Sequence, residues 1–423
     1  MRRDTEEFID GGNAEAGRMP EAVSKPEADG HLDERWHRAL LDELCDLKRA
    51  TGSAGEHAAA RWLADQLATA GAGDPRIEEA RGHQTFWWPL GLAAAAGVIT
   101  GARGMRRRSL GAAAIGALAA WAAADELPPR RRRLRRALPR ATATNVIATV
   151  GPADVRRTVV LVAHHDAAHS GLVFNPAIPS TIARLAPWFF EAADTSPPLL
   201  WPAVAGPALA ALGAATGARN LARLGAALSA GFTAAMVNIG ASAVVPGAND
   251  NGTGVVALIA LARALAERPT ESVRVMLLST SEEGLCEGMR VFAERHFDDL
   301  PISDTFFLAI DTVGSPHLLV LRGEGMLGIT EYPSRSLALL DELAEELGIG
   351  LFGNLRLRNA TDGVYPLAAG YECASLCSCT ELKQPANYHW PTDTPGNVDY
   401  GTVSDAIRLT EALVRRLDER WLH

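Results

Sequence analysis

The sequence predicts an α/β fold in which helices cover both faces of a mixed, largely parallel central sheet. Two observations support this fold class. Short apolar runs, such as 158–163 and 273–278, have the composition of strands that are buried on both faces. These runs alternate with longer segments, such as 254–267 and 402–418, whose apolar residues recur at helical spacing.

Length and composition exclude several classes of protein. The 423 residues suffice for a sizeable core, and for two or three domains of ~100–200 residues each. Hydrophobic residues make up 48% of the chain and charged residues 22%, which excludes wholesale disorder. The net charge of −9 argues against nucleic acid as a partner, because nucleic-acid binders usually present a basic face. Five cysteines are too few for a disulfide scaffold and suit a reducing compartment.

The N-terminal segment differs from the rest of the chain. Residues 1–30 are polar and have no apolar run, so we expect a disordered leader rather than a signal peptide. Helical spacing of apolar residues begins within 32–71, where Thr51-Gly52-Ser53 separates two patterns and predicts two helices. We therefore expect one main domain over 31–423.

Two hydrophobic stretches interrupt this domain, at 86–126 and 196–246. Each contains two uncharged runs separated by arginines, which predicts an inserted helical hairpin. A membrane-spanning helix needs roughly 20 apolar residues, so the first pair is marginal by length and the second is long enough. Because all four runs are rich in Ala and Gly, hairpins buried in a soluble protein remain an alternative. Tryptophans near the run ends, such as Trp87 and Trp201, favour membrane association through both hairpins.

The remaining elements follow in order. A turn at Gly151-Pro152 separates two predicted strands at 145–150 and 158–163. The expected elements after the second hydrophobic stretch are a helix at 254–267, strands at 273–278 and 305–310, and helices at 334–348 and 402–418.

Acidic and imidazole side chains follow these strands or sit in turns of small residues. They are His164-x-Asp166, Asp250, Glu282-Glu283, Asp311 and His389. Open α/β sheets bind ligands at the carboxyl ends of their strands, so we expect these side chains to meet there. Neutral imidazoles and carboxylates are zinc ligands, although each residue alone also has an ordinary structural explanation, such as helix capping by Asp250.

The ordered combination of motifs is more specific than any one of them. His-x-Asp, Asp-Asn-Gly-x-Gly, Glu-Glu-Gly, Asp and Tyr-His-x-Pro-x-Asp together resemble the co-catalytic di-zinc exopeptidases. That family includes bacterial leucyl aminopeptidases, Streptomyces-type aminopeptidases and glutaminyl-cyclase-like members. The resemblance runs from about residue 32 to 420, apart from the hydrophobic stretches. It implies a zinc peptidase domain over 31–423, two zinc ions per chain and a peptide or aminoacyl-amide substrate.

The resemblance also implies a role for each candidate residue. His164 and Asp311 would bind one zinc ion, Glu283 and His389 would bind the other, and Asp250 would bridge both. The charge balance agrees, because three carboxylates carry −3 and two zinc ions with a bridging hydroxide carry +3.

Three further residues would act beside the metals. Glu282 would be the general base, Asp166 would orient His164, and Tyr388 would help to polarise the substrate carbonyl. The late element Thr361-Asp362-Gly363 has Gly where the resemblance leads us to expect His, which concerns substrate specificity.

The sequence leaves other functions open. An aminopeptidase is the leading expectation. The alternatives are a dipeptidase, carboxypeptidase or deacylase, a glutaminyl-cyclase-like acyltransferase with one zinc, or a non-catalytic membrane scaffold. We expect a membrane-associated protein whose catalytic domain lies in the cytoplasm, because there is no signal peptide and cysteines are few.

Overall fold

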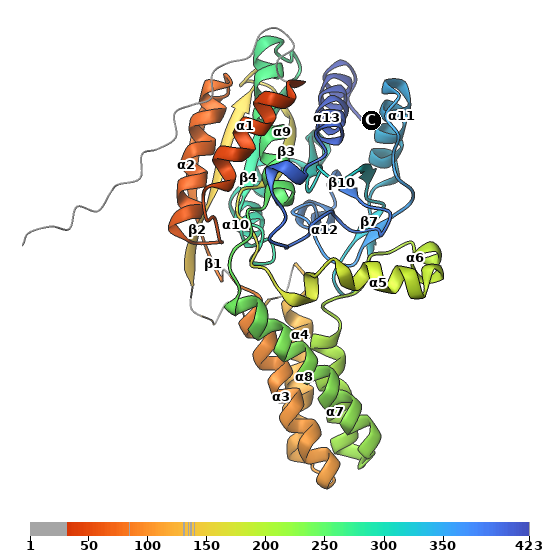
Figure 1. Cartoon of the computed structure of the whole chain (residues 1–423). Coiled ribbons are helices and arrows are strands. Elements are labelled where there is room, and N and C mark those ends of the chain that lie inside the picture. Colours follow the sequence, from red (N-terminus) through yellow and green to blue (C-terminus); the bar gives the residue numbers. More distant parts are fainter. Residues whose placement is uncertain are drawn as a thin grey trace, which may run out of the picture.

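The computed structural model describes residues 32–83, 85–129, 132, 133, 135, 138 and 140–422. The leader expected at 1–30 lies outside these residues. A seven-stranded sheet domain carries a bundle of four helices that projects from one end of it (Figure 1).

The central sheet is mixed, with four parallel strands in its middle. In spatial order its strands are β1 (Gly73–Gly82), β2 (Ala141–Val150), β4 (Val273–Thr280), β3 (Arg157–His164), β5 (Thr305–Ile310), β10 (Glu372–Cys379) and β6 (His317–Val320). β4, β3, β5 and β10 pair in parallel, whereas β1, β2 and β6 pair antiparallel at the two edges. This confirms the predicted α/β class and the mixed sheet, in which three of the six strand pairings are parallel and three are antiparallel. A small second sheet joins β7 (Gly323–Glu324), β8 (Thr330–Glu331) and β9 (Arg356–Leu357).

Helices pack on both faces of the sheet because its strands are apolar on both sides. One core contains Leu161 and Leu277 and is covered by α1 (Glu34–Cys45), α2 (Ala54–Thr69), α9 (Thr253–Glu267), α11 (Ser334–Leu347) and α13 (Tyr400–Glu419). The other core contains Val160 and Val162 and is covered by α10 (Glu287–His296), α12 (Val364–Ala369) and the root of the bundle.

The predicted elements lie close to the observed ones, but β1, β6 and β10 of the central sheet and the short strands β7, β8 and β9 were not predicted. The strand at 305–310 has the predicted bounds, and the strand predicted at 145–150 begins earlier, at Ala141. β1 was not predicted, because Asp74, Arg76 and Glu78 break any apolar pattern. β1 is an edge strand with mostly exposed side chains, so it needs no such pattern.

The bundle consists of α3 (Trp87–Arg106), α4 (Leu110–Glu126), α7 (Pro202–Thr216) and α8 (Arg219–Ala241) (Figure 1). Small residues let these helices approach closely: a Cβ added at Gly225 would lie 2.2 Å from the backbone nitrogen of Ala210. Among the described helices, α8 alone is long and apolar enough to cross a membrane, and α7 is apolar but shorter.

The second pair of bundle helices leaves and rejoins the sheet domain at a narrow neck. The Ser170 N–H donates to the Ala243 carbonyl at 2.9 Å, and the Val245 N–H donates to the Ala168 carbonyl at 2.9 Å. Between the neck and α7 the chain forms α5 (Ala177–Leu185) and α6 (Pro187–Ala192), which lie beside the root of the bundle (Figure 1).

Candidate metal centre

The carboxyl ends of β3, β4 and β5 bring the predicted site residues together. His164 is the last residue of β3, Glu282 and Glu283 follow β4, and Asp311 follows β5. Asp250 lies in a buried turn before α9, and His389 lies in the loop between β10 and α13. The edge of the parallel strands thus holds all six side chains.

Asp250 is the centre of this arrangement. Its Oδ1 lies 3.2 Å from Nε2 of His164, and its Oδ2 lies 3.2 Å from Nε2 of His389. Asp250 belongs to two sets of candidate ligands, and within each set the ligand atoms all lie within 4.8 Å of one another. One set adds His164 and Asp311, and the other adds Glu283 and His389.

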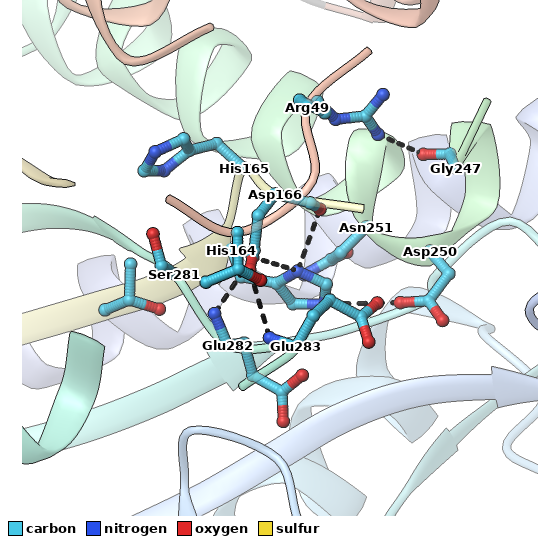
Figure 2. Close-up of polar contacts among 12 residues, drawn as sticks. Arg49, His164, His165, Asp166, Gly247, Asp250, Asn251, Ser281, Glu282 and Glu283 are labelled. Carbon is cyan, nitrogen blue, oxygen red and sulfur yellow. Dashed lines mark hydrogen bonds and ion pairs between the residues drawn. The ribbon is translucent and has the colours of Figure 1, made fainter. Parts of the chain in front are cut away.

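A third set overlaps these two. Ligand atoms of His164, Glu282 and Glu283 also lie within 4.8 Å of one another, which places the Glu282 carboxylate near His164 and Glu283. Figure 2 shows Glu282 below the turn that carries Glu283. Oε1 of Glu283 and Nδ1 of His389 are buried and have no hydrogen-bond partner among the described residues. Buried carboxylate and imidazole donors in two groups of three fit a pair of zinc ions.

The pKa values of this cluster depend on burial and neighbouring charge. Burial, opposed by His164, raises the pKa of Asp311 to about 6. Burial also raises the pKa of Glu283 well above its usual value, and the Asp250 charge adds to the effect. The pKa of Asp250 is lowered, because its interactions with His164 and His389 outweigh the effect of burial. Cations between these carboxylates would favour their ionised forms.

Asp166 holds two parts of the site at once. Its Oδ1 accepts a hydrogen bond from Nδ1 of His164 at 3.2 Å. Oδ1 also accepts the backbone N–H of Glu282 at 2.9 Å, and Oδ2 accepts that of Glu283 at 3.1 Å (Figure 2). The Thr51 hydroxyl donates to Oδ2 at 2.5 Å. The buried carboxylate therefore orients both the imidazole and the Glu-Glu turn.

Two positioning residues escaped the sequence analysis. The carboxylate of Asp393 accepts the backbone N–H of Asn249 at 2.7 Å and that of Asp250 at 3.1 Å. The guanidinium of Arg49 is fully buried and donates to the Pro246 and Gly247 carbonyls, both at 2.5 Å (Figure 2). Asp393 belongs to the Tyr-His-x-Pro-x-Asp motif, which was a signal for it, whereas nothing in the sequence distinguishes Arg49.

Glu282 is held in an apolar and acidic environment. The Cys286 thiol donates to its Oε1 at 3.1 Å. Burial raises the pKa of Glu282 well above its usual range, and the charge of Asp362 adds to this effect. Asp362, from the element that departs from the resemblance, accepts a hydrogen bond from the Thr280 hydroxyl.

Tyr388 borders the other side of the site. Its ring stacks on His389 with centroids 3.9 Å apart, and the ring of Phe174 packs against both. Burial raises the pKa of Tyr388 well above its usual value, so its hydroxyl remains a donor at neutral pH. The Asn359 amide donates to this hydroxyl at 3.2 Å.

Two other histidines close to His164 in the sequence, His165 and His169, point elsewhere. His165 contacts Glu56 at 2.9 Å and Ser279 at 3.0 Å, and Figure 2 shows its ring turned away from Asp250. Nδ1 of His169 lies 2.8 Å from the Ser242 carbonyl at the neck of the bundle. Neither ring belongs to the three sets of candidate ligands.

Comparison with known proteins adds two findings. Residues 233–414 match the sequence profile of peptidase family M28. The chain is structurally similar to a Zn-dependent exopeptidase from Parabacteroides distasonis, with TM-score 0.53, 13% identity, and coverage of 90% of this chain and 98% of that one. No match is found among curated proteins.

Two other solved structures have a similar fold. A zinc aminopeptidase from Bacillus subtilis has TM-score 0.52 and 15% identity, covering 91% of this chain and 95% of its own. A glutaminyl cyclase from Bacteroides thetaiotaomicron has TM-score 0.53 and 13% identity, covering 90% of this chain and 97% of its own. At these identities the similarity establishes a shared fold.

Proposed function

Because the chain belongs to peptidase family M28 through residues 233–414, we propose that it is a zinc-dependent aminopeptidase that removes N-terminal residues from peptides. One observation carries this proposal. The two carboxylate oxygens of Asp250 face two different histidines, each 3.2 Å away, and each belongs to a separate set of ligands. A carboxylate so placed suits a bridge between two metal ions.

The proposed ligand sets are those that the resemblance implies. His164 and Asp311 would hold one zinc ion, and Glu283 and His389 would hold the second, with Asp250 shared. When bound, two zinc ions would supply Lewis acidity and lower the pKa of a shared water toward ~7. The roles of the protein's own residues follow from their contacts.

Glu282 is the proposed general base. Its carboxylate lies beside the proposed ligands His164 and Glu283 without being needed in either set. Its raised pKa suits a group that takes a proton from the attacking water and returns it to the leaving amine. Tyr388, neutral and stacked on His389, would donate a hydrogen bond to the oxygen on which negative charge develops.

Metal content and hydrolysis, measured together, test this proposal. We expect about two zinc ions per chain and chelator-sensitive release of N-terminal residues from aminoacyl amides. The Glu282→Gln variant should keep its zinc and lose most turnover. Glu419→Gln changes an exposed glutamate at the end of α13 and is the matched control. Normal turnover of Glu282→Gln would refute its role as the base.

The fold also suits other amide chemistry. Glutaminyl cyclases share it, so one zinc per chain with cyclisation of N-terminal glutamine would favour that activity instead. The assay should also include dipeptides, peptides with free C-terminal residues and acylated amines as substrates. Their cleavage would indicate a dipeptidase, a carboxypeptidase or a deacylase, respectively. Loss of all activity with full zinc loading would favour a scaffold.

We also propose that the bundle associates with a membrane. All but two of the large apolar side chains that are exposed in the described chain lie on the bundle or on residues 172–201; the exceptions are Ile77 and Ile302. α5 has no buried residue, and Leu185 and Trp188 are 81% and 67% exposed. At about 1.5 Å per residue the 23-residue α8, the one described helix that is both long and apolar enough, is ~35 Å long and could cross a bilayer core of ~30 Å.

The peptidase domain is proposed to face the cytoplasm. All five cysteines are free thiols, which suits that compartment. The arginines at the far turns of the bundle, such as Arg106 and Arg219, would favour the opposite placement under the positive-inside rule. Labelling an exposed cysteine introduced at Glu419 in sealed vesicles decides the side. Carbonate extraction decides whether the chain is in the membrane.

A further inference from the structure

A cavity of about 720 Å³ lies beside the end of α4, and none of the proposed zinc ligands lines it. Its walls come from β1, α10, α12 and the residues that follow α4. The volume is in the range of small-molecule sites, ~300–1,000 Å³. The cavity lies in the sheet domain, next to the place where the bundle joins it.

The lining of this cavity is strongly basic. Two glutamates, Glu287 and Glu294, face six arginines: Arg81, Arg132, Arg135, Arg140, Arg290 and Arg295. This excess of positive charge contrasts with the net charge of −9 of the whole chain.

Carboxylates pair with five of the six arginines, and Glu126, Glu78 and Glu79 supply partners to Arg135, Arg295 and Arg81 from outside the lining. Glu287 is shared by three of the six arginines, with distances of 3.3 Å to Arg132, 3.7 Å to Arg135 and 3.1 Å to Arg290. Arg140 is exposed and has no ion-pair partner among the described residues. Arg140 therefore leaves one positive charge of the lining without a carboxylate partner in the described chain.

Two buried polar groups in the wall lack partners. Arg132 is only 2% exposed, and its Nε and Nη2 have no hydrogen-bond partner in the described chain. The hydroxyl of Tyr365 is also buried and without a partner, and its ring centroid lies 5.9 Å from Cζ of Arg132. Native proteins rarely leave buried donors unsatisfied, so these groups indicate a missing acceptor.

We propose that this cavity binds a phosphate-bearing anion. Guanidinium groups pair with phosphate through parallel N–H bonds, and several converge here with the Tyr365 hydroxyl. The phosphate could belong to a free anion or to the headgroup of an anionic lipid, since Pro129 in the wall lies three residues beyond α4 of the bundle.

The same arginines hold the loop that carries the candidate base. Nη1 of Arg132 donates to the Leu285 carbonyl, and Nη1 of Arg135 donates to the Gly284 carbonyl at 2.6 Å. Glu282 and Glu283 directly precede these carbonyls. Occupancy of the cavity would therefore stabilise the Glu-Glu turn, and this consequence for activity rests on the proposed function, whereas anion binding does not.

The experiment measures anion binding rather than turnover. The full chain in mild detergent is titrated with inorganic phosphate and pyrophosphate by calorimetry. Its binding to micelles that contain phosphatidylglycerol is compared with binding to micelles of phosphatidylcholine. The double variant Arg140→Gln, Tyr365→Phe removes one exposed charge and one buried hydroxyl. Arg335→Gln, an exposed arginine of α11 outside the cavity, is the matched control.

We expect the double variant to bind at least tenfold more weakly, with the control unchanged. Weakened binding of soluble phosphate identifies a free anion, and weakened binding confined to phosphatidylglycerol identifies a lipid headgroup. The proposal is overturned if the double variant and the control bind every probe alike. Zinc content and the melting temperature confirm that each variant is folded, and Tyr365→Phe alone replaces the double variant if it is not.

Discussion

The carboxylate of Asp393 lies directly behind Asp250, and its Oδ2 accepts the Asp250 backbone N–H at 3.1 Å. Asp393 is 1% exposed, and burial raises its pKa to about 7. The carboxylate that we propose as the bridge is therefore oriented by a second carboxylate that would not touch the metals.

The first prediction concerns this support. Asp393→Asn keeps the shape of the side chain but replaces one acceptor oxygen by an amide donor opposite a backbone N–H. We expect zinc affinity to fall about 10–100-fold, the usual cost of losing a residue that orients a metal ligand. Competition with a chromogenic chelator measures this. Asp405→Asn, on the surface of α13, is the control, and equal zinc affinity of the two variants would refute the role of Asp393.

The second prediction concerns metal removal. Asp311 and Glu283 each lie close to Asp250 and have raised pKa values, so cations bound between these carboxylates should stabilise the folded state. Chelation should lower the melting temperature, and added zinc should restore it. At a hundredfold excess over the dissociation constant, bound zinc would add about 2.7 kcal/mol to the free energy of unfolding. A melting temperature that changes neither on chelation nor on addition of zinc would contradict the proposal that these residues bind metal.

The third prediction separates Tyr388 from the metal ligands. Tyr388→Phe removes the hydroxyl and keeps the ring that stacks on His389. We expect kcat to fall ~10²-fold, as for other lost oxyanion donors, with zinc content and KM little changed. Steady-state kinetics with an aminoacyl amide measures this. A changed KM with unchanged kcat would instead assign Tyr388 to substrate binding.

The fourth prediction is a pH dependence of stability. Burial raises the pKa of Glu324 to about 8, although Tyr332 donates to it at 2.6 Å and Thr361 at 2.7 Å. Between its unfolded pKa of ~4.3 and about 8 the native state binds more protons, so this glutamate makes the free energy of unfolding fall as pH rises. Denaturant unfolding at pH 5 and pH 8 should show a smaller loss in Glu324→Gln. The exposed Glu331→Gln should behave like the wild type.

The fifth prediction compares two glycines of α8. A Cβ at Gly225 would meet the Ala210 backbone at 2.2 Å, whereas one at Gly231 would meet nothing within 4 Å. Gly225→Ala should therefore lower the melting temperature by separating α7 from α8. Gly231→Ala should stabilise α8 by up to ~1 kcal/mol through its helix propensity. Thermal unfolding in detergent compares them, and equal shifts would contradict the packing of the bundle.

The sequence predicted β3, β4 and β5 of the parallel core because these strands carry their own signal. Val159 to Ala163 are all buried, so a continuous apolar run was sufficient. The sequence missed β10, whose run of Cys, Ala and Ser contains one large apolar residue, Leu376. Edge strands lack this signal: β1 pairs through its backbone and exposes charged side chains.

The site was predicted unevenly for a similar reason. His164, Glu283 and His389 are residue types that often bind metals, and the order of their motifs along the sequence indicated that they belong to one site. Arg49 could not be found, because its role depends on the tertiary position of Gly247, which is 198 residues away in the chain.

The neck at Ala168 and Val245 encloses α7 and α8 in the sequence, which sets the order in which the bundle and the candidate ligands are synthesised. His164 leaves the ribosome before α7 and α8 exist, and Asp250 follows only after both helices have been synthesised. His389 emerges last of the candidate ligands. At ~5–20 residues per second, the ribosome needs several seconds or more after α8 to reach it. The nascent chain therefore completes its bundle before it can assemble all the candidate ligands, so the proposed hydrolase would be inactive throughout the period in which the bundle would meet a bilayer.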